Sequence, residues 1–355
     1  MKALVAMSGG VDSSVAAALM LEQGHDVVGV TLKQWEGPGG ALPTAGCCTV
    51  GDAEDARRAA AQLDIPYYVL DYVDEFRHAV VDRFGEQYAA GRTPNPCIEC
   101  NRKVRFRALL ERTAELGCEI LVTGHHARIT HDDDGWHLRT ATDPDKDQSY
   151  VLHMLDQTAL AQVRLPVGEM SKTDVREHAR RLGLRTADKP DSQDLCFVGH
   201  GDYRDFLREH FPDVAGPGDI VDTDGTVVGT HAGTVDFTIG QRKGLGVTAP
   251  EPRYVVDIKP STATIVIGRK EELLAPGCEV EEVSWVAGHP PANPEVTVKL
   301  RYRSDAVPAS IEPAGEQWLT RFSVPQRGVT PGQAAVFYRG DEVLGGGTIA
   351  GRLES

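Results

Sequence analysis

Short apolar runs alternate with helical patterns over the first two hundred residues of the chain. Four of the apolar runs have the length and composition of buried strands, at 3–7, 26–32, 66–72 and 119–124. Apolar residues recur at helical spacing between them, at about 13–23, 52–63, 74–89 and 101–116. This alternation of strands and helices predicts a parallel sheet covered by helices.

Two further helices are expected before the pattern changes. The segment 171–183 begins with a Ser-x-x-Asp capping pattern and ends at a glycine, and a second helical pattern covers about 202–210. Beyond 210, short β-branched runs are separated by Gly, Asp-Gly and Pro turns, which is typical of an all-β region. An Ala-Pro-Gly sequence at 275–277 marks a boundary within this region.

Three segments lie outside these periodic patterns. The loops at 36–51 and 185–201 are long and lack periodicity, and such loops in a folded domain are often functional. The run HDDDGWH at 131–137 predicts a hairpin turn whose charges face water. Turn residues explain that run fully, so we do not expect a metal site there.

Length and composition indicate a soluble protein of several domains. A chain of 355 residues is too long for one ordinary core and is expected to form two or three domains. The apolar run near the N-terminus is too short for a signal peptide or a membrane span, so we expect a cytoplasmic protein without membrane contact. The seven cysteines show no disulfide framework, which favours reduced thiols, metal ligands or catalysis.

The net charge of −15 argues against a broad basic surface for nonspecific nucleic-acid binding. Basic residues nevertheless cluster at 101–107, 240–246 and 299–303. Such clusters can contact phosphates locally and position a nucleic acid, with binding that weakens as salt rises.

The stretch MSGGVDSSVAAALM, residues 7–20, places a glycine loop between the first strand and the first helix. In a parallel sheet this turn presents backbone N–H groups and the positive end of a helix dipole, which form an anion site. The loop contains no lysine to reach a terminal phosphate, and Asp12 is better suited to a magnesium ion than to phosphate. A simple capped turn is the structural alternative.

The loop also resembles the SGGxDS signature of the PP-loop ATP pyrophosphatases, which bind ATP and cleave it between the α and β phosphates. The resemblance implies a Rossmann-like parallel sheet of the adenine nucleotide α-hydrolase type, with ATP and Mg²⁺ bound. The expected ATP site consists of Ala6, Met7, Ser8, Gly9, Gly10, Val11, Asp12, Ser13, Ser14, Leu32 and Gly124.

Two cysteine motifs lie far apart in the sequence. GRTPNPCIECNRKVRF, residues 91–106, combines a Pro-Asn-Pro turn, a Cys-x-x-Cys and a basic helix start. Cys100 beside Arg102 and Lys103 at a helix N-terminus is expected to have a lowered pKa. Cys196 lies in the second motif, KPDSQDLCFVGHGDYRDFL.

Together with TGHHAR, KDQSYVL, FTIGQRKGLG, RYR and TPGQAAVFY, these motifs resemble the tRNA-specific 2-thiouridylases over nearly the whole chain. The resemblance implies ATP-dependent replacement of the C2 oxygen of the wobble uridine, position 34 of tRNA, by sulfur. It further implies a PP-loop catalytic domain at 1–204, a small β-rich central domain at 205–274 and a tRNA-docking β-barrel at 275–355. A sulfur-donor protein, such as a cysteine desulfurase or a sulfur relay, would be a second partner.

By the same resemblance, Cys196 carries a persulfide, and Cys100 either liberates its terminal sulfur or closes a disulfide with it. The target base must leave its stack to reach these thiols. Residues expected to line its pocket or contact the anticodon arm are Asn95, Pro96, Cys97, His125, Lys146, Asp147, Gln148, Arg301, Tyr302 and Gln333.

Cys97 is a departure, because many family members carry aspartate at this position. Cys97, Cys100 and Cys196 could therefore ligate a [4Fe-4S] cluster whose open iron accepts sulfur. A spare thiol and a zinc site are the simpler alternatives, although structural zinc usually has four protein ligands. Cys47, Cys48, Cys118 and Cys278 are expected to be structural.

Two other functions remain open at this point. A different PP-loop ligase could adenylate a carboxylate or carbonyl and admit ammonia, and it would not need Cys100 and Cys196. A noncatalytic RNA-binding or iron–sulfur redox protein could retain the nucleotide fold, and it would release no pyrophosphate.

Overall fold

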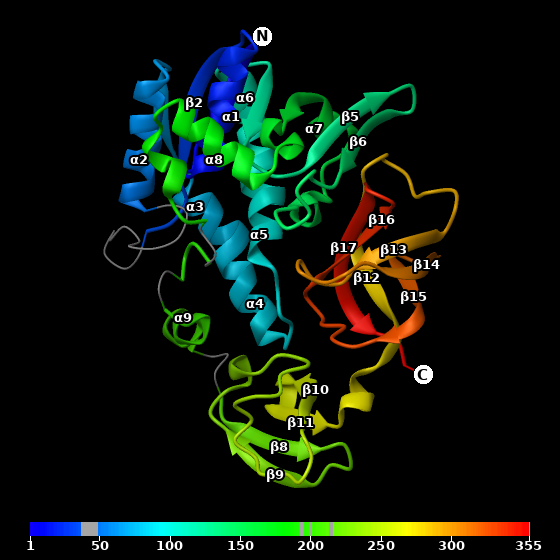
Figure 1. Ribbon diagram of the computed structural model, residues 1–355. Helices are drawn as coiled ribbons and strands as arrows, with labels where there is room; N and C mark the ends of the chain where they lie inside the picture. Colours follow the sequence, from blue (N-terminus) through cyan, green and yellow to red (C-terminus); the bar gives the residue numbers. More distant parts are fainter. Residues whose placement is uncertain (37–48, 192–194, 199–200, 213–215, 355) are drawn as a thin grey trace.

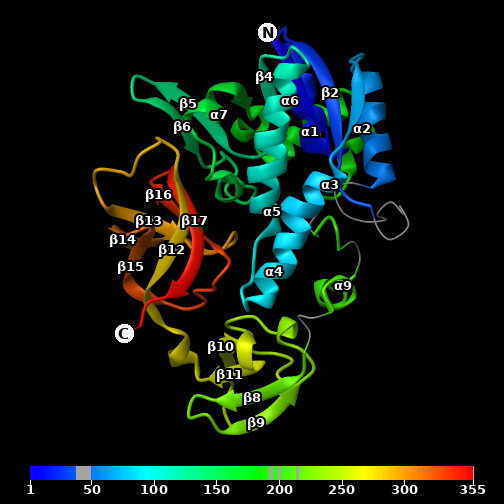
Figure 2. The same cartoon turned by 180° about the vertical axis from the view of Figure 1, so that it is seen from behind.

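The computed structural model describes residues 1–36, 49–191, 195–198, 201–212 and 216–354 of the chain. Cys47 and Cys48 lie outside these ranges. Figures 1 and 2 show a parallel-sheet region at one end, a small β region at the other, and a β-barrel beside them. Within the described residues, no helix is both long and apolar enough to cross a membrane.

The N-terminal region is built on a parallel sheet in the strand order β3-β2-β1-β4-β7. Its strands are β1 (Lys2–Ala6), β2 (Asp26–Lys33), β3 (Tyr67–Asp71), β4 (Ile120–Thr123) and β7 (Val163–Arg164). Alternate residues of β1 face opposite sides, with Ala3 and Val5 in one apolar cluster and Leu4 in another. The predicted α/β fold with a Rossmann-like parallel sheet is confirmed.

Helices pack against both faces of the sheet. Residues of three helices share the cluster of Ala3 and Val5: α1 (Val11–Glu22), α2 (Val50–Gln62) and α8 (Lys172–Arg181). The opposite face is covered by two long helical segments that contain π turns. These are α3 (Val73–Phe76), η2 (Arg77–Asp82) and α4 (Arg83–Ala89), then α5 (Pro96–Glu99), η3 (Cys100–Ala108) and α6 (Leu109–Glu115).

The second long segment begins at Pro96, five residues before the predicted start at 101. Asn95 accepts a hydrogen bond from the backbone N–H of Cys97 at 3.1 Å, and proline occupies the first helical position. Both features favour a helix start. The Pro-Asn-Pro sequence was read as a turn, whereas its second half begins the helix.

Shorter elements complete the N-terminal region and its link to the β regions. The remaining helices are α7 (Gln157–Gln162) and α9 (Tyr203–His210). The 3-10 turns are η4 (Ser149–Leu152), η5 (Pro166–Glu169), η6 (Arg185–Asp188), η8 (Thr234–Asp236), η9 (Pro260–Thr262) and η10 (Lys270–Leu273).

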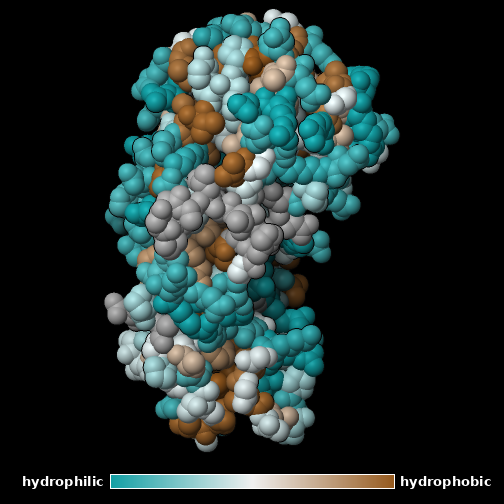
Figure 3. All heavy atoms as spheres, turned by 90° about the vertical axis from the view of Figure 1, so that its left-hand side faces the viewer, coloured by the Kyte–Doolittle hydropathy of each residue, from teal (hydrophilic) through white to brown (hydrophobic). Residues whose placement is uncertain are grey.

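The central β region has its own small core. Its sheet has the order β10-β11-β8-β9 and packs Ile220, Phe237, Val255 and Ile265 together. The strands are β8 (Gly218–Asp222), β9 (Val227–His231), β10 (Tyr254–Lys259) and β11 (Thr264–Gly268). The face shown in Figure 3 is mostly hydrophilic, with apolar side chains in small groups over this region and the parallel-sheet region.

The C-terminal strands close into an antiparallel barrel, as expected. The order β12-β15-β14-β13-β16-β17 is closed by pairing of β12 with β17. The strands are β12 (Ala275–Trp285), β13 (Glu295–Lys299), β14 (Val307–Ala314), β15 (Gln317–Gln326), β16 (Ala334–Arg339) and β17 (Glu342–Arg352).

The predicted hairpin exists, as β5 (Arg128–Asp132) and β6 (Gly135–Arg139), but its charges do not all face water. Strand β6 pairs with β17, so the hairpin extends the barrel sheet. His137 lies between Asp132 Oδ1 at 2.9 Å and Glu342 Oε1 at 2.7 Å. The charges of the turn itself, Asp132 to Asp134, face water as predicted, and only His137 departs, because a hairpin edge can pair with a strand far away in sequence.

Candidate functional site

The glycine loop between β1 and α1 is closely packed against its neighbours. Gly9 has a φ of +72°, and a Cβ there would meet the backbone oxygen of Asp52 at 2.1 Å. A Cβ on Gly124, which follows β4, would meet the backbone nitrogen of Ser13 at 2.5 Å. Both positions therefore require glycine, and Gly124 lies directly against the start of α1.

Hydroxyl groups of the loop hold its own backbone. The Ser8 N–H donates to Ser13 Oγ at 3.1 Å, and the Ser14 hydroxyl donates to the Gly10 carbonyl at 2.9 Å. No side chain caps α1 at Gly10. The helix dipole of α1 is thus directed at the loop, which is the arrangement expected of an anion site.

Asp12 in this loop is bound by two groups from elsewhere in the chain. Lys172 Nζ donates to its carboxylate oxygens at 2.8 and 2.7 Å, and His126 Nε2 lies 3.0 Å from Oδ1. Burial would raise the pKa of Asp12, but the His126 hydrogen bond and the Lys172 charge outweigh it, and the pKa is lowered. Asp12 is therefore a carboxylate at neutral pH.

Asp191 joins the same network. Its carboxylate contacts Lys172 at 2.7 Å, Lys146 at 2.9 Å and Arg176 at 3.6 Å. Although burial raises the pKa of Asp191, hydrogen bonds from Lys172 and Lys146 lower it to about 2. Three cations therefore meet beside the loop, held by two carboxylates.

Lys189 binds the loop from its other side. Its Nζ donates to the Gly9 carbonyl at 3.0 Å and to Asp52 and Asp55 at 2.7 Å each. Sequence reasoning found no lysine within the loop and missed Lys172 and Lys189, which the fold brings there. The signal was present, because Lys172 follows the predicted cap at Ser171 and Lys189 opens the Cys196 motif.

The other expected ATP residues lie at the ends of β1 and β2. The Met7 N–H donates to the Val30 carbonyl at 2.7 Å, and Thr31 Oγ1 donates to the Met7 carbonyl at 2.6 Å. Leu32 is buried near them on β2. The ATP contacts of Ala6, Met7, Val11 and Leu32, like those of the other loop residues and Gly124, stay predictions.

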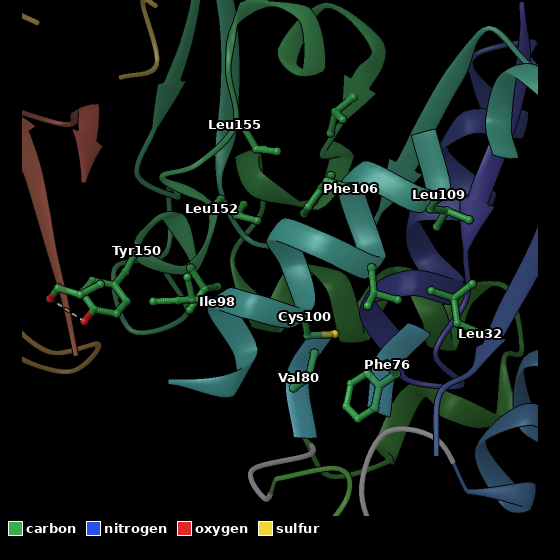
Figure 4. Packing of buried hydrophobic residues seen from close by; sticks show 14 of the residues in the cluster. Leu32, Phe76, Val80, Ile98, Cys100, Phe106, Leu109, Tyr150, Leu152 and Leu155 are labelled. Carbon is green, nitrogen blue, oxygen red and sulfur yellow. Dashed lines mark hydrogen bonds between the residues drawn. The ribbon is translucent and has the colours of Figure 1, made fainter. Parts of the chain in front are cut away.

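The two cysteines of Cys-x-x-Cys differ in exposure. Cys97 lies in the first turn of α5 and is exposed, whereas Cys100 is buried and 7% exposed. Figure 4 shows Cys100 among Val80, Phe76 and Ile98, and Gln34 Nε2 lies 3.3 Å from its sulfur. The helix N-terminus, which was expected at Cys100, therefore lies near Cys97. Cys100 is one turn further along the helix.

Cys196 is partly buried and packs against the same apolar cluster that contains Cys100. Its neighbour Phe197 packs its ring edge-on against Phe84, Phe76 and Trp35. The cluster thus joins segments almost a hundred residues apart. Among the described residues, no group of three His, Cys, Asp or Glu side chains is placed to hold a metal ion.

The residues of the KDQS motif point into the protein. Lys146 binds Asp191, as described above, and Asp147 accepts hydrogen bonds from Ser149. Gln148 Oε1 accepts from the His126 N–H at 2.8 Å and so fixes the histidine that contacts Asp12. These bonds connect the motif to the nucleotide loop; its tRNA contacts stay a prediction.

His125 is buried as well. Its Nδ1 lies 2.8 Å from Thr123 Oγ1, and its ring packs against Phe106. Burial, with a smaller effect of the Arg105 charge, lowers the pKa of His125 to about 3, so the ring is neutral. A tRNA contact by this side chain stays a prediction, and its position favours a packing role.

Arg301 and Tyr302, two residues expected to contact tRNA, follow β13 of the barrel. Tyr302 is 38% exposed, and its ring lies 6.1 Å from that of Tyr150. Burial, together with smaller effects of Asp147 and Cys97, raises the pKa of Tyr302. Arg301 Nη2 donates to Thr330 Oγ1 at 2.9 Å.

Gln333 joins the barrel to the start of the cysteine motif. Its Nε2 donates to the Thr93 carbonyl at 2.7 Å. Asn95 uses its side-chain oxygen as the helix cap, and Pro96 is buried. The structure thus brings Asn95, Cys97, Tyr302 and Gln333 to the junction of the N-terminal region and the barrel.

Three family models match successive parts of the chain. A model described as tRNA methyl transferase HUP domain matches residues 1–200. A model described as tRNA methyl transferase PRC-barrel domain matches residues 204–269, and one described as aminomethyltransferase beta-barrel domain matches residues 275–349.

Full-length relatives are also found. The tRNA-specific 2-thiouridylase MnmA of Geobacter metallireducens is 47% identical over 98% of this chain and 96% of its own length. The protein of the same name from Carboxydothermus hydrogenoformans is 48% identical over 99% of this chain and 98% of its own. A solved 4-thiouridine synthetase–RNA complex with bound ATP is 19% identical, with a TM-score of 0.38, over 60% of this chain and 50% of that chain.

Proposed function

This chain belongs to the tRNA-specific 2-thiouridylase family and is a tRNA sulfurtransferase, and we propose that it thiolates C2 of the wobble uridine using ATP. One observation carries the proposal. Gln34, which directly follows β2, bonds Cys100, while Val30 and Thr31 of the same strand bond Met7 beside the glycine loop. A single strand therefore connects the nucleotide loop to the thiol.

In the proposed first step, the uridine C2 oxygen attacks the α phosphorus of ATP, and pyrophosphate leaves as the N3 proton is lost. The loop N–H groups and Lys172 neutralise the charge that develops on the leaving pyrophosphate. Preorganised donors of this kind contribute about 10²–10³-fold in rate each. Supporting this role, Lys172 is buried against the loop and already holds a carboxylate.

Asp12 is the residue that would hold a magnesium ion, because carboxylate oxygens suit that ion. A bound ion would polarise the phosphates. Both oxygens of Asp12 are bonded to Lys172 here, so the ion would have to take the place of the lysine.

The second proposed step moves sulfur. The terminal sulfur of a Cys196 persulfide attacks C2, and AMP leaves with the original C2 oxygen. The Cys100 thiolate then attacks Sγ of Cys196, forming the Cys100–Cys196 disulfide. The electron pair of the broken S–S bond passes to the sulfur on C2, and N3 regains a proton. An external dithiol restores both thiols, and a sulfur-donor protein reloads Cys196.

We propose the predicted division of labour among the domains, with catalysis in residues 1–204 and tRNA docking by 205–274 and 275–355. Contacts to the anticodon arm by Asn95, Lys146, Arg301 and Tyr302 belong to the same proposal. The iron–sulfur alternative keeps the reaction but requires Cys97, Cys100 and Cys196 to converge, and as placed here they do not form such a site.

The test is an anaerobic reaction with ATP, magnesium, a sulfur-donor protein that carries a persulfide, and unmodified tRNA, read by mass spectrometry of 2-thiouridine. We expect Cys100→Ala and Cys196→Ala to lose thiolation by at least about 10³-fold, because each removes a group that bonds the transferred sulfur or its carrier. Cys97→Ala should retain activity within a few-fold. Cys278→Ala is the matched control, since that thiol is buried in the separate core of the barrel.

Other outcomes favour other functions. If all three cysteines are essential and activity follows bound iron, the cluster alternative holds. Amide formation that survives loss of Cys100 and Cys196 would indicate another PP-loop ligase, and absence of pyrophosphate release would indicate a noncatalytic protein.

A further inference from the structure

The cysteine segment, residues 92–102, is held by the barrel at both of its ends. It includes α5 with Cys97 and the start of η3 with Cys100, and it runs between the parallel-sheet region and the barrel in Figure 1. The barrel residues that contact it lie on β12 and on the turn between β15 and β16.

The first end is held by three contacts. Arg92 forms an ion pair with Glu281 at 2.5 Å. The Thr93 N–H donates to the Pro331 carbonyl at 2.8 Å, and the Thr93 carbonyl accepts from Gln333 at 2.7 Å. Both backbone groups of Thr93 are thus bonded to the barrel, two residues before the helix cap.

The second end is held by a cluster of charges around Glu282. Arg83 Nη2 donates to both carboxylate oxygens of Glu282, at 3.0 and 2.8 Å, and Arg102 Nη1 donates to it at 3.3 Å. The same arginines contact Glu99 of α5 at 3.5 and 3.4 Å. Glu282 therefore bridges α4 and the cysteine helix from the barrel side.

The backbone of Glu282 is held in an unfavourable conformation. Its φ is +51°, in the left-handed region, and the pairing of β12 with β17 shifts register between Glu281 and Ser284. Such a conformation costs free energy in a non-glycine residue and persists only where the surroundings hold it. Here the bulge turns the Glu282 carboxylate toward the two arginines.

The surrounding interface is not completely filled. A small cavity is lined by residues of α4, α5 and the barrel, including Asn95 and Gly332. Three atoms of its lining residues are buried without a hydrogen-bond partner: Glu99 Oε2, Arg102 Nε and His153 Nε2. Apolar packing also holds the cysteine helix, since Ile98 and Ala334 belong to one buried cluster, and the charge cluster adds a specific polar contact.

We propose that Glu282 is a positioning residue for sulfur transfer, through which the barrel sets the place of the Cys97–Cys100 helix. The inference rests on the proposed role of Cys100 as the thiol that releases sulfur. Without the Glu282 carboxylate, Arg83 and Arg102 form ion pairs only with Glu99. At this end of the segment, no ion pair then fixes the distance between the cysteine helix and the barrel. Sulfur transfer then suffers more than nucleotide chemistry, because the glycine loop makes none of these contacts.

The test compares Glu282→Gln with Glu312→Gln, which removes a similar exposed ion pair with Arg321 elsewhere on the barrel. Three quantities are measured on the full chain: 2-thiouridine formation, pyrophosphate release, and alkylation of individual cysteines by iodoacetamide. For Glu282→Gln we expect kcat of thiolation to fall at least about tenfold, with pyrophosphate release in the first turnover and the KM for tRNA within about twofold of the wild-type values. Alkylation of Cys100 should rise about fivefold or more, and that of Cys278 should not change. Glu312→Gln should resemble wild type throughout.

A second variant separates the carboxylate from backbone strain. Glu282→Gly relieves the left-handed strain, so it should fold, and it should show the same loss of thiolation as Glu282→Gln. Wild-type thiolation and wild-type Cys100 alkylation in both variants would overturn the proposal, as would an equal loss of pyrophosphate release. If wild type itself makes no 2-thiouridine, the proposed function fails, while the alkylation rates still decide whether Glu282 positions the helix.

Discussion

At the scale of single residues, the nucleotide loop shows how distant side chains complete a site. The loop contributes backbone N–H groups and Asp12, and the cations come from Lys146, Lys172 and Lys189. Four carboxylates hold these cations, those of Asp12, Asp52, Asp55 and Asp191. We expect the phosphates of a bound nucleotide to replace carboxylates as the anions that contact these lysines.

This arrangement makes Lys172 the most sensitive cation. Lys172→Gln should lower ATP-dependent pyrophosphate release by about 10²-fold or more, since a preorganised charge at the leaving group is lost. Lys259→Gln, on an exposed lysine of the central region, is the control and should release pyrophosphate at the wild-type rate. The measurement is a continuous pyrophosphate assay with tRNA present. Equal rates for the two variants would remove Lys172 from the reaction.

The residues of this site were only partly predictable from sequence. The glycines and serines of the loop carry a local signature, because a strand, a tight turn and a helix start follow one another directly. Lys172 and Lys189 are separated from the loop by more than 150 residues, and only the fold brings them to it. The Cys100 environment was misjudged, because the cap at Asn95 moves the helix start upstream.

At the scale of elements, the β5–β6 hairpin couples the N-terminal region to the barrel. It pairs with β17 through Leu138 and Arg139, and Arg128 and Arg139 both contact Asp341. Burial lowers the pKa of His137, but the hydrogen bonds that its ring donates to Glu342 and Asp132 outweigh this effect and raise it. The folded protein thus favours the protonated ring.

A raised pKa of His137 predicts a pH-dependent contribution to stability. The contribution is fully present below about pH 6.5, the ordinary histidine value, and is lost as pH rises through the folded-state pKa. The free energy of unfolding should therefore differ more between wild type and His137→Gln at pH 6 than at pH 9. The difference should stay below about 1 kcal/mol, because partly exposed ion pairs contribute little. Exposed His289 provides the control His289→Gln; an identical difference at both pH values would contradict the prediction.

Most elements were predictable because their signals are local. The apolar strands of the parallel sheet and the capped helix α8 match their expected ranges closely. The addition of β6 to the barrel sheet was not predictable, since nothing within 131–137 indicates a partner at 342–343. Pairing between distant edges depends on tertiary structure, which single segments do not encode.

At the scale of the whole molecule, the barrel meets the catalytic region through charges. Arg83, Arg92 and Arg102 all bond acidic residues of β12, so part of the basic cluster predicted for tRNA serves this junction. These three arginines of an acidic protein therefore gather at one interface, because they form ion pairs with carboxylates there. The remaining exposed basic residues, such as Arg107 and Arg303, stay candidates for phosphate contacts.

The central claim is that one active site adenylates the C2 oxygen of uridine and then replaces it with sulfur. The most direct measurement uses tRNA carrying ¹⁸O at C2 of the target uridine, with mass spectrometry of the nucleotide products. The account predicts one ¹⁸O in each AMP per 2-thiouridine formed, because the C2–O bond breaks after the oxygen has bonded to phosphorus. Thiolated tRNA formed with unlabelled AMP would contradict the account.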